Sequence, residues 1–256
     1  MVIDSHAHLN DERLIESVDE IVADMTKDNL SAIITVSYDR KSAEQGLALA
    51  QKHNNIYTTL GIHPHDSRLA CKEDYDYFVD NAQNPKVVAI GEIGLDYYYD
   101  LSDREVQKKV MVEQLELANE VNLPVVFHLR DAYQDFIQII KENKHLINNG
   151  ALLHCYSGSL ELVDIFNLYD FYYAFGGAIT FKTAKKDQII RRVPKERLLI
   201  ETDCPYMAPV PYRGKLNYPK MVNLVAQKIA HSLQIPLNEV ERLTVENTKR
   251  LFKKLV

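Results

Sequence analysis

The sequence predicts a single α/β domain, residues 1–256, folded as one (β/α)8 TIM barrel with its active site at the carboxyl ends of the strands. The 256 residues match the ~250 typical of such a barrel. Short β-rich runs alternate with longer stretches of helical period, as in parallel strands joined by crossover helices. Histidines and acids also recur where these runs end, and barrel active sites form at that end of the strands.

Eight runs are predicted as strands. They cover residues 2–6, 32–37, 56–61, 87–92, 124–128, 151–154, 172–176 and 198–201. Apolar residues at steps of three and four predict amphipathic helices over 14–25 and 105–121. The stretch 218–256 predicts two helices divided at Ile235-Pro236. A doubly wound open sheet would also alternate in this way, but eight units favour a closed barrel.

The composition is that of a soluble globular protein with a substantial core, at 46% hydrophobic and 26% charged residues. The three cysteines are too few for a disulfide framework, and no secretory leader precedes the first strand. No run approaches the ~18 apolar residues of a membrane helix. We therefore expect a cytoplasmic protein with no membrane association. The sequence is compatible with a monomer and does not fix the oligomeric state.

The formal net charge of −6 argues against a nucleic-acid packaging protein, which would be basic overall. It does not exclude a nuclease, because bound cations add positive charge where a phosphate sits. Residues 182–197 are rich in lysine and arginine. This segment is either a solvated helix surface or part of a phosphate-binding region.

The first predicted strand runs into Asp4-Ser5-His6-Ala7-His8. Side chains alternate along a strand, so His6 and His8 point to the same side, where two imidazoles could hold one cation. The pair is weak evidence alone, since a single histidine such as His53 is more often an ordinary polar side chain.

The prediction of a metal site depends mainly on polar residues that recur at the ends of the later strands. They occur in the segments 61–65 (GIHPH), 91–96 (GEIGLD), 128–131 (HLRD), 154–158 (HCYSG) and 201–205 (ETDCP). Imidazole and carboxylate together suit zinc, manganese and similar divalent ions. Glu92 ends a buried strand, where a carboxylate without a cation or donor would be costly. The set therefore predicts a metal centre. Cys155 and Cys204 are interpreted as small buried residues rather than ligands or nucleophiles.

These blocks, in this order, resemble the TatD-like deoxyribonuclease family of metal-dependent hydrolases. The resemblance runs from His6 to Pro219. It implies that one divalent cation is held by His6, His8 and Asp203 and a second by His128 and His154, with Glu92 bridging the two. The ions would be Mg²⁺, Mn²⁺ or Zn²⁺. Asp203 would orient and deprotonate the attacking water, with assistance from Glu201, which shares its strand face.

The resemblance further implies a deoxyribonuclease that cleaves phosphodiester bonds, similar to a 3'-5' exonuclease acting on single-stranded DNA ends. His63 and Arg130 are expected on the substrate side, although Arg130 could instead form a structural ion pair with Asp131 or another acid. The family segment P-x-R-G-x-x-N-x-P is matched by residues 211–219 and brings in Arg213 as a substrate contact. Leu216 and Tyr218 depart from the usual residues of this segment. Tyrosines near the loop ends either stack on bases or simply pack; they are Tyr97, Tyr98, Tyr99, Tyr206, Tyr212 and Tyr218.

Two other functions stay open at this stage. The same cations could polarise the carbonyl of a small substrate, as in an amidohydrolase or esterase. A cationic groove leading to the metals would favour the nuclease, and a closed apolar pocket would favour the small substrate. A non-catalytic scaffold stabilised by metal is the third alternative, although it would need no candidate base.

Overall fold

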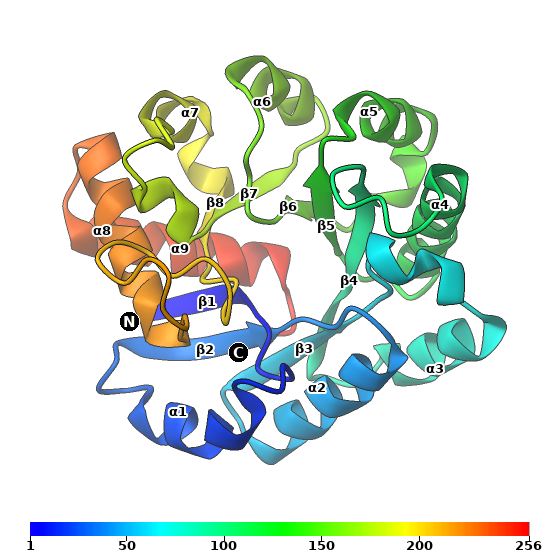
Figure 1. Cartoon of the computed structure of the whole chain (residues 1–256), viewed down its shortest axis with the longest axis horizontal. Helices are drawn as coiled ribbons and strands as arrows, with labels where there is room; N and C mark the ends of the chain where they lie inside the picture. The colour runs from blue at the N-terminus through cyan, green and yellow to red at the C-terminus, as the bar shows by residue number, and fades with distance from the viewer. Residues whose placement is uncertain (256) are drawn as a thin grey trace.

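A computed structural model describes residues 1–255 of the chain. Within them the strands form one parallel sheet in the order β1 to β8, wrapped into a nearly closed barrel with the helices outside (Figure 1). The strands are β1 (Val2–Ala7), β2 (Leu30–Thr35), β3 (Ile56–Leu60), β4 (Val87–Asp96), β5 (Val125–Arg130), β6 (Ala151–Leu153), β7 (Tyr172–Phe175) and β8 (Leu198–Ile200). The predicted barrel is confirmed, and each predicted strand is found within a few residues of its expected bounds.

Helices follow the strands in the expected alternation. The α-helices are α1 (Val18–Asp24), α2 (Arg40–Lys52), α3 (Lys72–Ala82), α4 (Arg104–Glu120), α5 (Tyr133–Glu142), α6 (Leu160–Asn167), α7 (Asp187–Arg192), α8 (Val222–Leu233) and α9 (Leu237–Leu251). Short 3-10 turns are η1 (Ile15–Ser17), η2 (Pro64–Leu69), η3 (Lys144–Leu146), η4 (Gly177–Thr180), η5 (Lys195–Arg197) and η6 (Pro219–Met221).

The predicted helices are confirmed with one correction. The helix expected over 14–25 is divided into η1 and α1, and Ser17 makes no side-chain capping bond at the start of α1. Helix α4 begins beside Asp103, whose carboxylate accepts hydrogen bonds from the backbone N–H groups of Glu105 and Val106. Pro236 separates α8 from α9, as the missing N–H of proline predicts.

The barrel closes between the end of β1 and the segment that follows β8. The Asp203 N–H donates to the His6 carbonyl at 2.9 Å, and the His8 N–H donates to the Cys204 carbonyl at 2.7 Å. Deeper in the barrel, the buried Asp4 carboxylate accepts from the Thr202 N–H at 2.9 Å. These bonds fix the end of β1 against the segment that follows β8.

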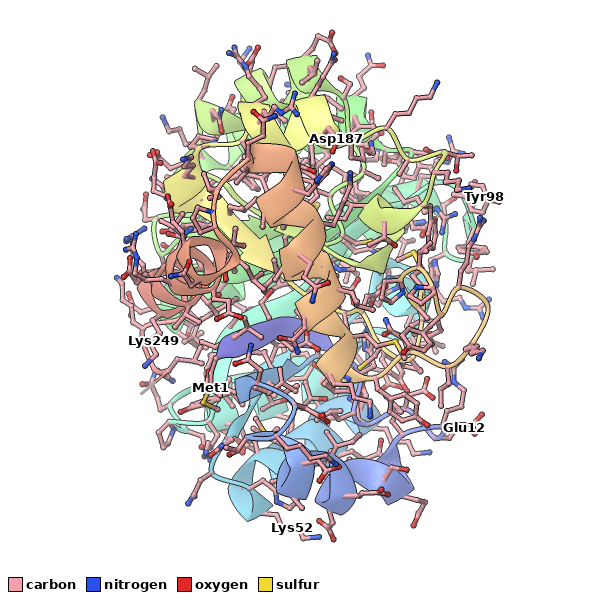
Figure 2. All side chains as sticks on the ribbon, turned by 90° about the vertical axis from the view of Figure 1, so that its left-hand side faces the viewer. Met1, Glu12, Lys52, Tyr98, Asp187 and Lys249 are labelled. Atoms are coloured by element: carbon pink, nitrogen blue, oxygen red, sulfur yellow. The ribbon has the colours of Figure 1, made fainter. Side chains whose placement is uncertain are left out.

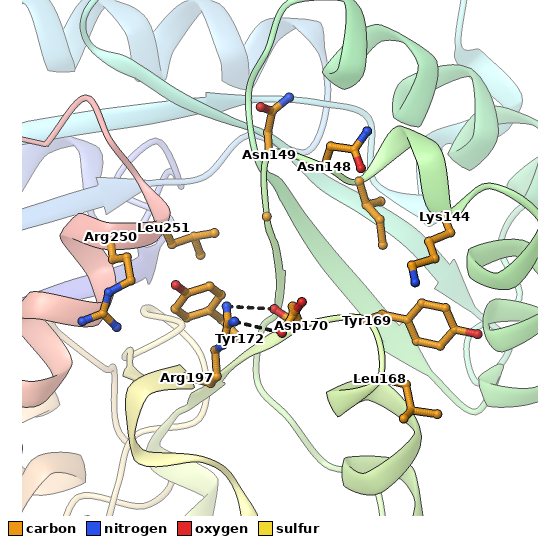
Figure 3. Close-up of a pocket in the computed structure, with 12 residues that line it drawn as sticks. Lys144, Asn148, Asn149, Leu168, Tyr169, Asp170, Tyr172, Arg197, Arg250 and Leu251 are labelled. Carbon is orange, nitrogen blue, oxygen red and sulfur yellow. Dashed lines mark hydrogen bonds and ion pairs between the residues drawn. The ribbon is translucent and has the colours of Figure 1, made fainter.

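The two ends of the barrel differ in character. Figure 2 shows Glu12 and Tyr98 at one end and Met1 and Lys249 at the other. At the amino-terminal ends of β6 to β8 a cavity of about 350 Å³ lies between Lys144, Tyr169, Arg197 and Arg250 (Figure 3). Its arginines already have partners: Arg197 pairs with Asp170 at 3.0 Å, and Arg250 donates to the Glu196 carbonyl at 3.1 Å. This cavity holds none of the candidate site residues.

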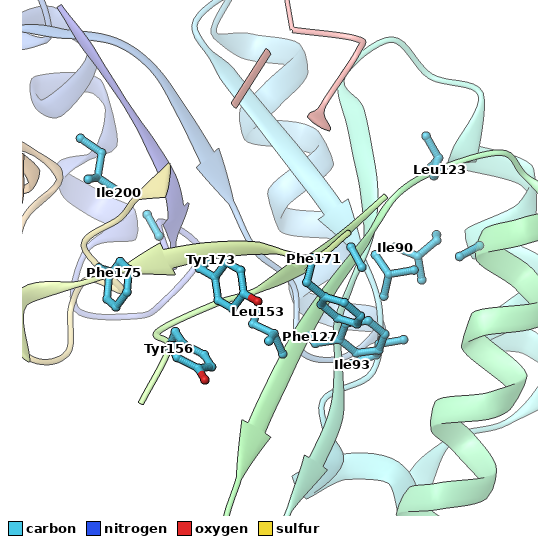
Figure 4. Close-up of a cluster of buried hydrophobic side chains, with 14 of the residues drawn as sticks. Ile90, Ile93, Leu123, Phe127, Leu153, Tyr156, Phe171, Tyr173, Phe175 and Ile200 are labelled. Carbon is cyan, nitrogen blue, oxygen red and sulfur yellow. The ribbon is translucent and has the colours of Figure 1, made fainter. Parts of the chain in front are cut away.

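The hydrophobic core lies in two layers. Between the sheet and the helices, aromatic rings pack edge to face, as Phe127 does against Phe136 with centroids 4.9 Å apart; Figure 4 shows part of this layer. A second cluster joins strand residues such as Val126, Leu152 and Leu199 to the end of α9. Each of these three lies two positions before a polar residue, namely His128, His154 and Glu201. One strand face therefore carries apolar side chains below and the polar site above.

Two irregularities in strand pairing lie beside the candidate site. The β1–β2 register shifts between Asp4 and Ala7, and the β4–β5 register shifts between Gly91 and Ile93. Ile3 belongs to the same cluster as Val126, yet His6, three positions later, also joins the polar site. A regular strand would point these two side chains to opposite faces, so the shift re-aims His6.

Across residues 1–255, no helix combines the length and apolar character that crossing a membrane requires. The three cysteines are unpaired, with Cys204 buried and Cys71 exposed.

Candidate metal centre and active site

Six predicted ligands meet at the carboxyl ends of the strands. They come from β1 and the residue just after it, from β4 and β5, and from the residues that follow β6 and β8: His6, His8, Glu92, His128, His154 and Asp203. Their donor atoms form compact groups, in which His6, His8 and Asp203 lie together and Glu92 joins further histidines. The arrangement offers nitrogen and oxygen donors from five different strand ends to one small volume.

Glu92 lies at the middle of this centre and divides the histidines between its two oxygens. Its Oε2 faces His6 Nε2 at 3.4 Å and His8 Nε2 at 3.9 Å. Its Oε1 faces His128 Nδ1 at 2.9 Å and His154 Nε2 at 2.8 Å. A carboxylate with a separate set of imidazoles at each oxygen has the geometry of a bridge between two cations.

Asp203 completes the side of the centre near β1. Its Oδ1 lies 3.3 Å from His8 Nε2 and 3.8 Å from His6 Nε2. The backbone N–H of Asp203 is bonded to the His6 carbonyl, so the barrel closure also positions this carboxylate.

The buried charges shift each other's ionisation. Burial alone would raise the pKa of Glu92, but His154 and His6 hold it well below its ordinary value. Burial lowers the pKa of His154, whereas Glu92 and Glu201 raise it well above its ordinary value. For His6, burial and the neighbouring His154 lower the pKa. The surrounding histidines therefore offset the burial of Glu92 and favour its ionised form.

The donor set fits divalent cations. Both ring nitrogens of His6 are buried without a hydrogen-bond partner among the described residues, and so is Nδ1 of His154. Buried polar atoms are normally paired, so the orphaned His6 Nε2, which faces Glu92 and Asp203, indicates a ligand that the protein itself does not supply. Imidazole with carboxylate is a donor combination for zinc, manganese or iron.

Two carboxylates lie behind the histidines, and the sequence prediction assigned neither of them to a histidine. Asp96 Oδ2 accepts from His128 Nε2 at 2.9 Å and from His65 Nε2 at 3.1 Å, although Asp96 is completely buried. Burial raises the pKa of Asp96, and the hydrogen bonds from His128 and His65 lower it far more. Glu201, expected to assist Asp203, instead has its Oε1 3.5 Å from His154 Nδ1 and accepts from the Cys155 N–H at 2.6 Å.

The signal for Asp96 was present in the sequence. It stands four residues after Glu92 in the GEIGLD block, and strand alternation places it on the same face. Its partner could not be read from the sequence, because the contact with His128 depends on the β4–β5 register, in which Asp96 lies opposite Arg130.

His63 lies in the centre, and its ring orientation is set by a backbone contact. The His65 N–H donates to His63 Nδ1 at 3.1 Å, so the proton of the neutral ring is on Nε2. That Nε2 lies 3.6 Å from Glu92 Oε1. Burial and the nearby His128 hold the pKa of His63 well below its ordinary value. His63 is thus a neutral hydrogen-bond donor pointing into the centre.

Arg130 lies at the mouth, over two tyrosine rings. Its guanidinium carbon is 3.9 Å from the centroid of Tyr98 and 4.9 Å from that of Tyr99. Both rings are more than half exposed. Among residues 1–255 no acid forms an ion pair with Arg130, so the alternative pairing with Asp131 is not found.

The other tyrosines differ in exposure. Tyr206 is partly exposed at the mouth, with Arg13 over its ring at 4.5 Å. Tyr97 is a packing residue, since its hydroxyl donates to Asp135 at 2.7 Å and Arg104 covers its ring.

Arg213 and most of the basic segment lie apart from the metal centre. The exposed Arg213 stacks on Phe181 at 4.5 Å and does not line the cleft around the ligands in the part of the chain that the structure describes. Within 182–197, Lys186 lines the cleft and donates to the Ser157 carbonyl at 2.6 Å. Arg192 instead pairs with Asp164 at 2.6 Å. The segment is mainly a solvated surface.

The cleft has two lobes that share His128, Arg130, His154 and Asp203. One lobe, of about 440 Å³, extends past Leu129, Ile179 and Lys186. The other, of about 400 Å³, extends past His63, Tyr99 and Tyr206. The candidate ligands therefore lie between two spaces, each large enough for part of a substrate.

Comparison with known proteins agrees with this architecture. The structure superposes on that of YJJV, a TatD homolog from Escherichia coli K12, with a TM-score of 0.93, 27% sequence identity and 98% of each chain covered. The metal-dependent hydrolase YabD of Bacillus subtilis (strain 168), itself uncharacterised, is 39% identical over 254 residues, or 99% of each chain. The 3'-5' ssDNA/RNA exonuclease TatD of Escherichia coli (strain K12) is 28% identical over 257 residues, or 98% of each.

The family model described as TatD related DNase matches residues 3–253. That span includes every residue of the metal centre. The chain belongs to the TatD related DNase family of metal-dependent hydrolases.

Proposed function

We propose that residues 1–256 form one hydrolase domain that uses two divalent cations to cleave phosphodiester bonds of DNA, releasing nucleotides from single-stranded 3' ends. The observation that carries this proposal is the division of histidines between the two oxygens of Glu92, with His6 and His8 at Oε2 and His128 and His154 at Oε1. Two ligand sets sharing one carboxylate suit a two-metal phosphodiesterase.

His6, His8 and Asp203 would hold one cation, His128 and His154 the second, and Glu92 both. The histidine-rich set favours Mn²⁺ or Zn²⁺ over Mg²⁺, which prefers oxygen donors. When bound, the cations would lower the pKa of water and offset negative charge on the phosphoryl oxygens.

The chain's own residues divide the remaining tasks. Asp203 lines both lobes and carries a carboxylate that can accept the proton of the attacking water. His63 donates from Nε2 toward a phosphate or leaving oxygen. Arg130 holds a phosphate with its guanidinium while the rings of Tyr98 and Tyr99 support it. A substrate contact from Arg213 stays a prediction. The Arg213 side chain stacks on Phe181 and does not line the cleft, so its position does not support that contact.

Exposed tyrosines at the mouth favour a nucleic acid as substrate. Tyr98, Tyr99 and Tyr206 present ring faces beside arginines, a combination that binds bases and phosphates of single strands. The relative TatD is named as an exonuclease on single-stranded DNA and RNA. RNA is accordingly the comparison substrate in the experiment.

A small ester or amide is the second candidate substrate. The observation that favours it is the apolar part of the larger lobe, lined by Leu129, Ile179 and Ala184. In that case the cations would polarise a carbonyl instead of a phosphoryl group. A scaffold without catalysis is disfavoured by Asp203 and His63, a base and a donor that such a protein would not need.

The experiment is metal-dependent release of mononucleotides. Protein stripped with a chelator is incubated with single-stranded DNA or RNA, and Mg²⁺, Mn²⁺ or Zn²⁺ is added back. We expect release that depends on metal, is abolished by Glu92→Ala, and falls about 10²- to 10⁴-fold in Asp203→Asn, which lacks the base. The exposed Asp100→Asn is the matched control and should retain activity.

Two outcomes would contradict the proposal. Cations bound without cleavage of either nucleic acid would move the assignment to the small ester or amide. Full activity in a folded Asp203→Asn protein would remove Asp203 from the mechanism.

A further inference from the structure

Asp96 links the metal centre to the substrate-binding mouth through its two carboxylate oxygens. Its Oδ2 accepts from His128 Nε2 at 2.9 Å, and its Oδ1 accepts from the backbone N–H groups of Tyr98 at 3.0 Å and Tyr99 at 2.8 Å. We infer that Asp96 is a positioning residue, which orients His128 toward the second cation and fixes the turn that presents Tyr98 and Tyr99. The inference rests on the two-metal function proposed above.

Asp96 determines which ring nitrogen of His128 is available to a cation. One ring nitrogen, Nδ1, faces Glu92 Oε1 at 2.9 Å, and the other faces Asp96. A histidine that binds a cation through one nitrogen carries its proton on the other, and a carboxylate accepting that proton fixes both the tautomer and the ring plane. Asp96 therefore leaves Nδ1 free to bind a cation beside Glu92.

Asp96 also fixes the turn that follows β4. With both N–H groups bonded to one buried oxygen, the backbone of Tyr98 and Tyr99 cannot turn away from the mouth without breaking these bonds. Their rings carry the guanidinium of Arg130, which follows His128 by two residues on β5. One carboxylate thus places a metal ligand and the aromatic support of a phosphate-binding arginine.

Asp96 itself is held rigidly. The buried Gln107 of α4 accepts from the Asp96 N–H at 2.8 Å and donates to its carbonyl at 3.2 Å. His65 supplies a second donor to Oδ2 at 3.1 Å, which assigns this histidine to the support of Asp96. With both oxygens engaged and the backbone clamped, the carboxylate has a fixed position from which to orient its neighbours.

The test is Asp96→Asn. The amide keeps one oxygen for either His128 or the turn and presents an N–H donor to the other side, so His128 Nε2 and the turn cannot both retain an acceptor. We expect two cations per wild-type protein, and a variant in which the second cation binds about 10- to 100-fold more weakly while the first is unchanged. Affinities are measured by competition of Zn²⁺ or Mn²⁺ with a chelating dye, without reference to nuclease activity.

Two controls separate the parts of the inference. Asp100→Asn removes the same charge from an exposed position nearby and should leave both affinities unchanged. Tyr98→Ala with Tyr99→Ala should raise KM for a single-stranded oligonucleotide with both cation affinities unchanged. If Asp100→Asn weakened the second cation as much as Asp96→Asn does, the loss of affinity would come from the change in net charge. That result would overturn the positioning role of Asp96.

A measurement on the wild type keeps the inference testable if Asp96→Asn does not fold. Long-range ¹H–¹⁵N NMR of the ring, assigned with His128→Gln, should find the His128 proton on Nε2 in the Zn²⁺-loaded protein. A proton on Nδ1, or a folded Asp96→Asn protein with wild-type affinity for both cations, overturns the role of Asp96. A wild type that binds one cation contradicts the two-metal function instead, so the two failures are distinguishable.

Discussion

Glu201 repeats, behind His154, the arrangement that Asp96 makes behind His128. Its Oε1 lies 3.5 Å from His154 Nδ1 and accepts from the Cys155 N–H, and the side chain is completely buried. His128 and His154, the two candidate ligands at Glu92 Oε1, therefore each have a carboxylate near their other ring nitrogen. Such outer partners fix the tautomer of a histidine ligand and raise its basicity.

We predict that Glu201→Gln weakens metal binding and lowers kcat by about 10- to 100-fold, because the neutral amide no longer stabilises the His154 N–H. The fold should be retained, since the amide oxygen can still accept from Cys155. Cation titration and steady-state kinetics on the same preparation measure this, with the exposed Glu196→Gln as control. Unchanged kcat and unchanged cation affinity would mean that Glu201 has a purely structural role.

The strand ends predicted where the ligands lie, the resemblance to the TatD-like family implied which six they are, and the structure brings all six together. The sequence could not assign Asp96 and Glu201 to their histidines, since these contacts depend on the relative height of neighbouring strands. It also could not separate Arg130 from Arg213. The two have similar motif support, but β5 carries Arg130 into the cleft, whereas the loop before α8 leaves Arg213 outside it.

At the scale of elements, strand β4 depends on close approach to its neighbours. At Gly94 φ is +140°, and an added Cβ would lie 2.0 Å from the carbonyl oxygen of His128 on β5. Strand alternation and turn residues were sufficient to predict the eight strands. They could not predict the register shifts in β1 and β4, because an irregular pairing is a property of two strands together.

We predict that Gly94→Ala lowers the free energy of unfolding by about 3–5 kcal/mol, since it combines a clash with a backbone conformation that only glycine adopts readily. Gly214→Ala is the matched control. Its φ is +85° and no atom lies within 4 Å of the added Cβ, so it should cost only about 1–2 kcal/mol. Urea denaturation of both variants decides the prediction; equal costs would mean that β4 and β5 separate easily.

At the scale of the whole molecule, the metal centre joins the first strand to the last. His6 and His8 come from the β1 side, Asp203 follows β8, and the barrel closes there through the bonds of Asp203 and Cys204. A cation held by these residues would cross-link the seam of the barrel. A cation that binds the folded state and not the unfolded chain stabilises the fold, by about 2.7 kcal/mol when the free ion is at 100 times its Kd.

We therefore predict that removing the cations with a chelator lowers Tm by about 5–10 °C and that adding Mn²⁺ or Zn²⁺ restores it. Differential scanning calorimetry at fixed protein concentration measures the shift. The Glu92→Ala variant lacks the bridging carboxylate, so adding or removing cations should change its Tm only slightly. A Tm independent of cations in the wild type would contradict tight binding at the seam.

The closure of the seam also has a consequence for synthesis of the chain on the ribosome. Ser5 donates to the carbonyl of Ile200, a partner 195 residues later. At roughly 5–20 residues per second, the ribosome needs about 10–40 s to make that interval. During this time β1 can pair with β2 while its other edge stays open, and Asp203 does not yet exist. The nascent barrel can thus gather histidines early, but it acquires a complete metal centre only when translation has passed its eighth strand.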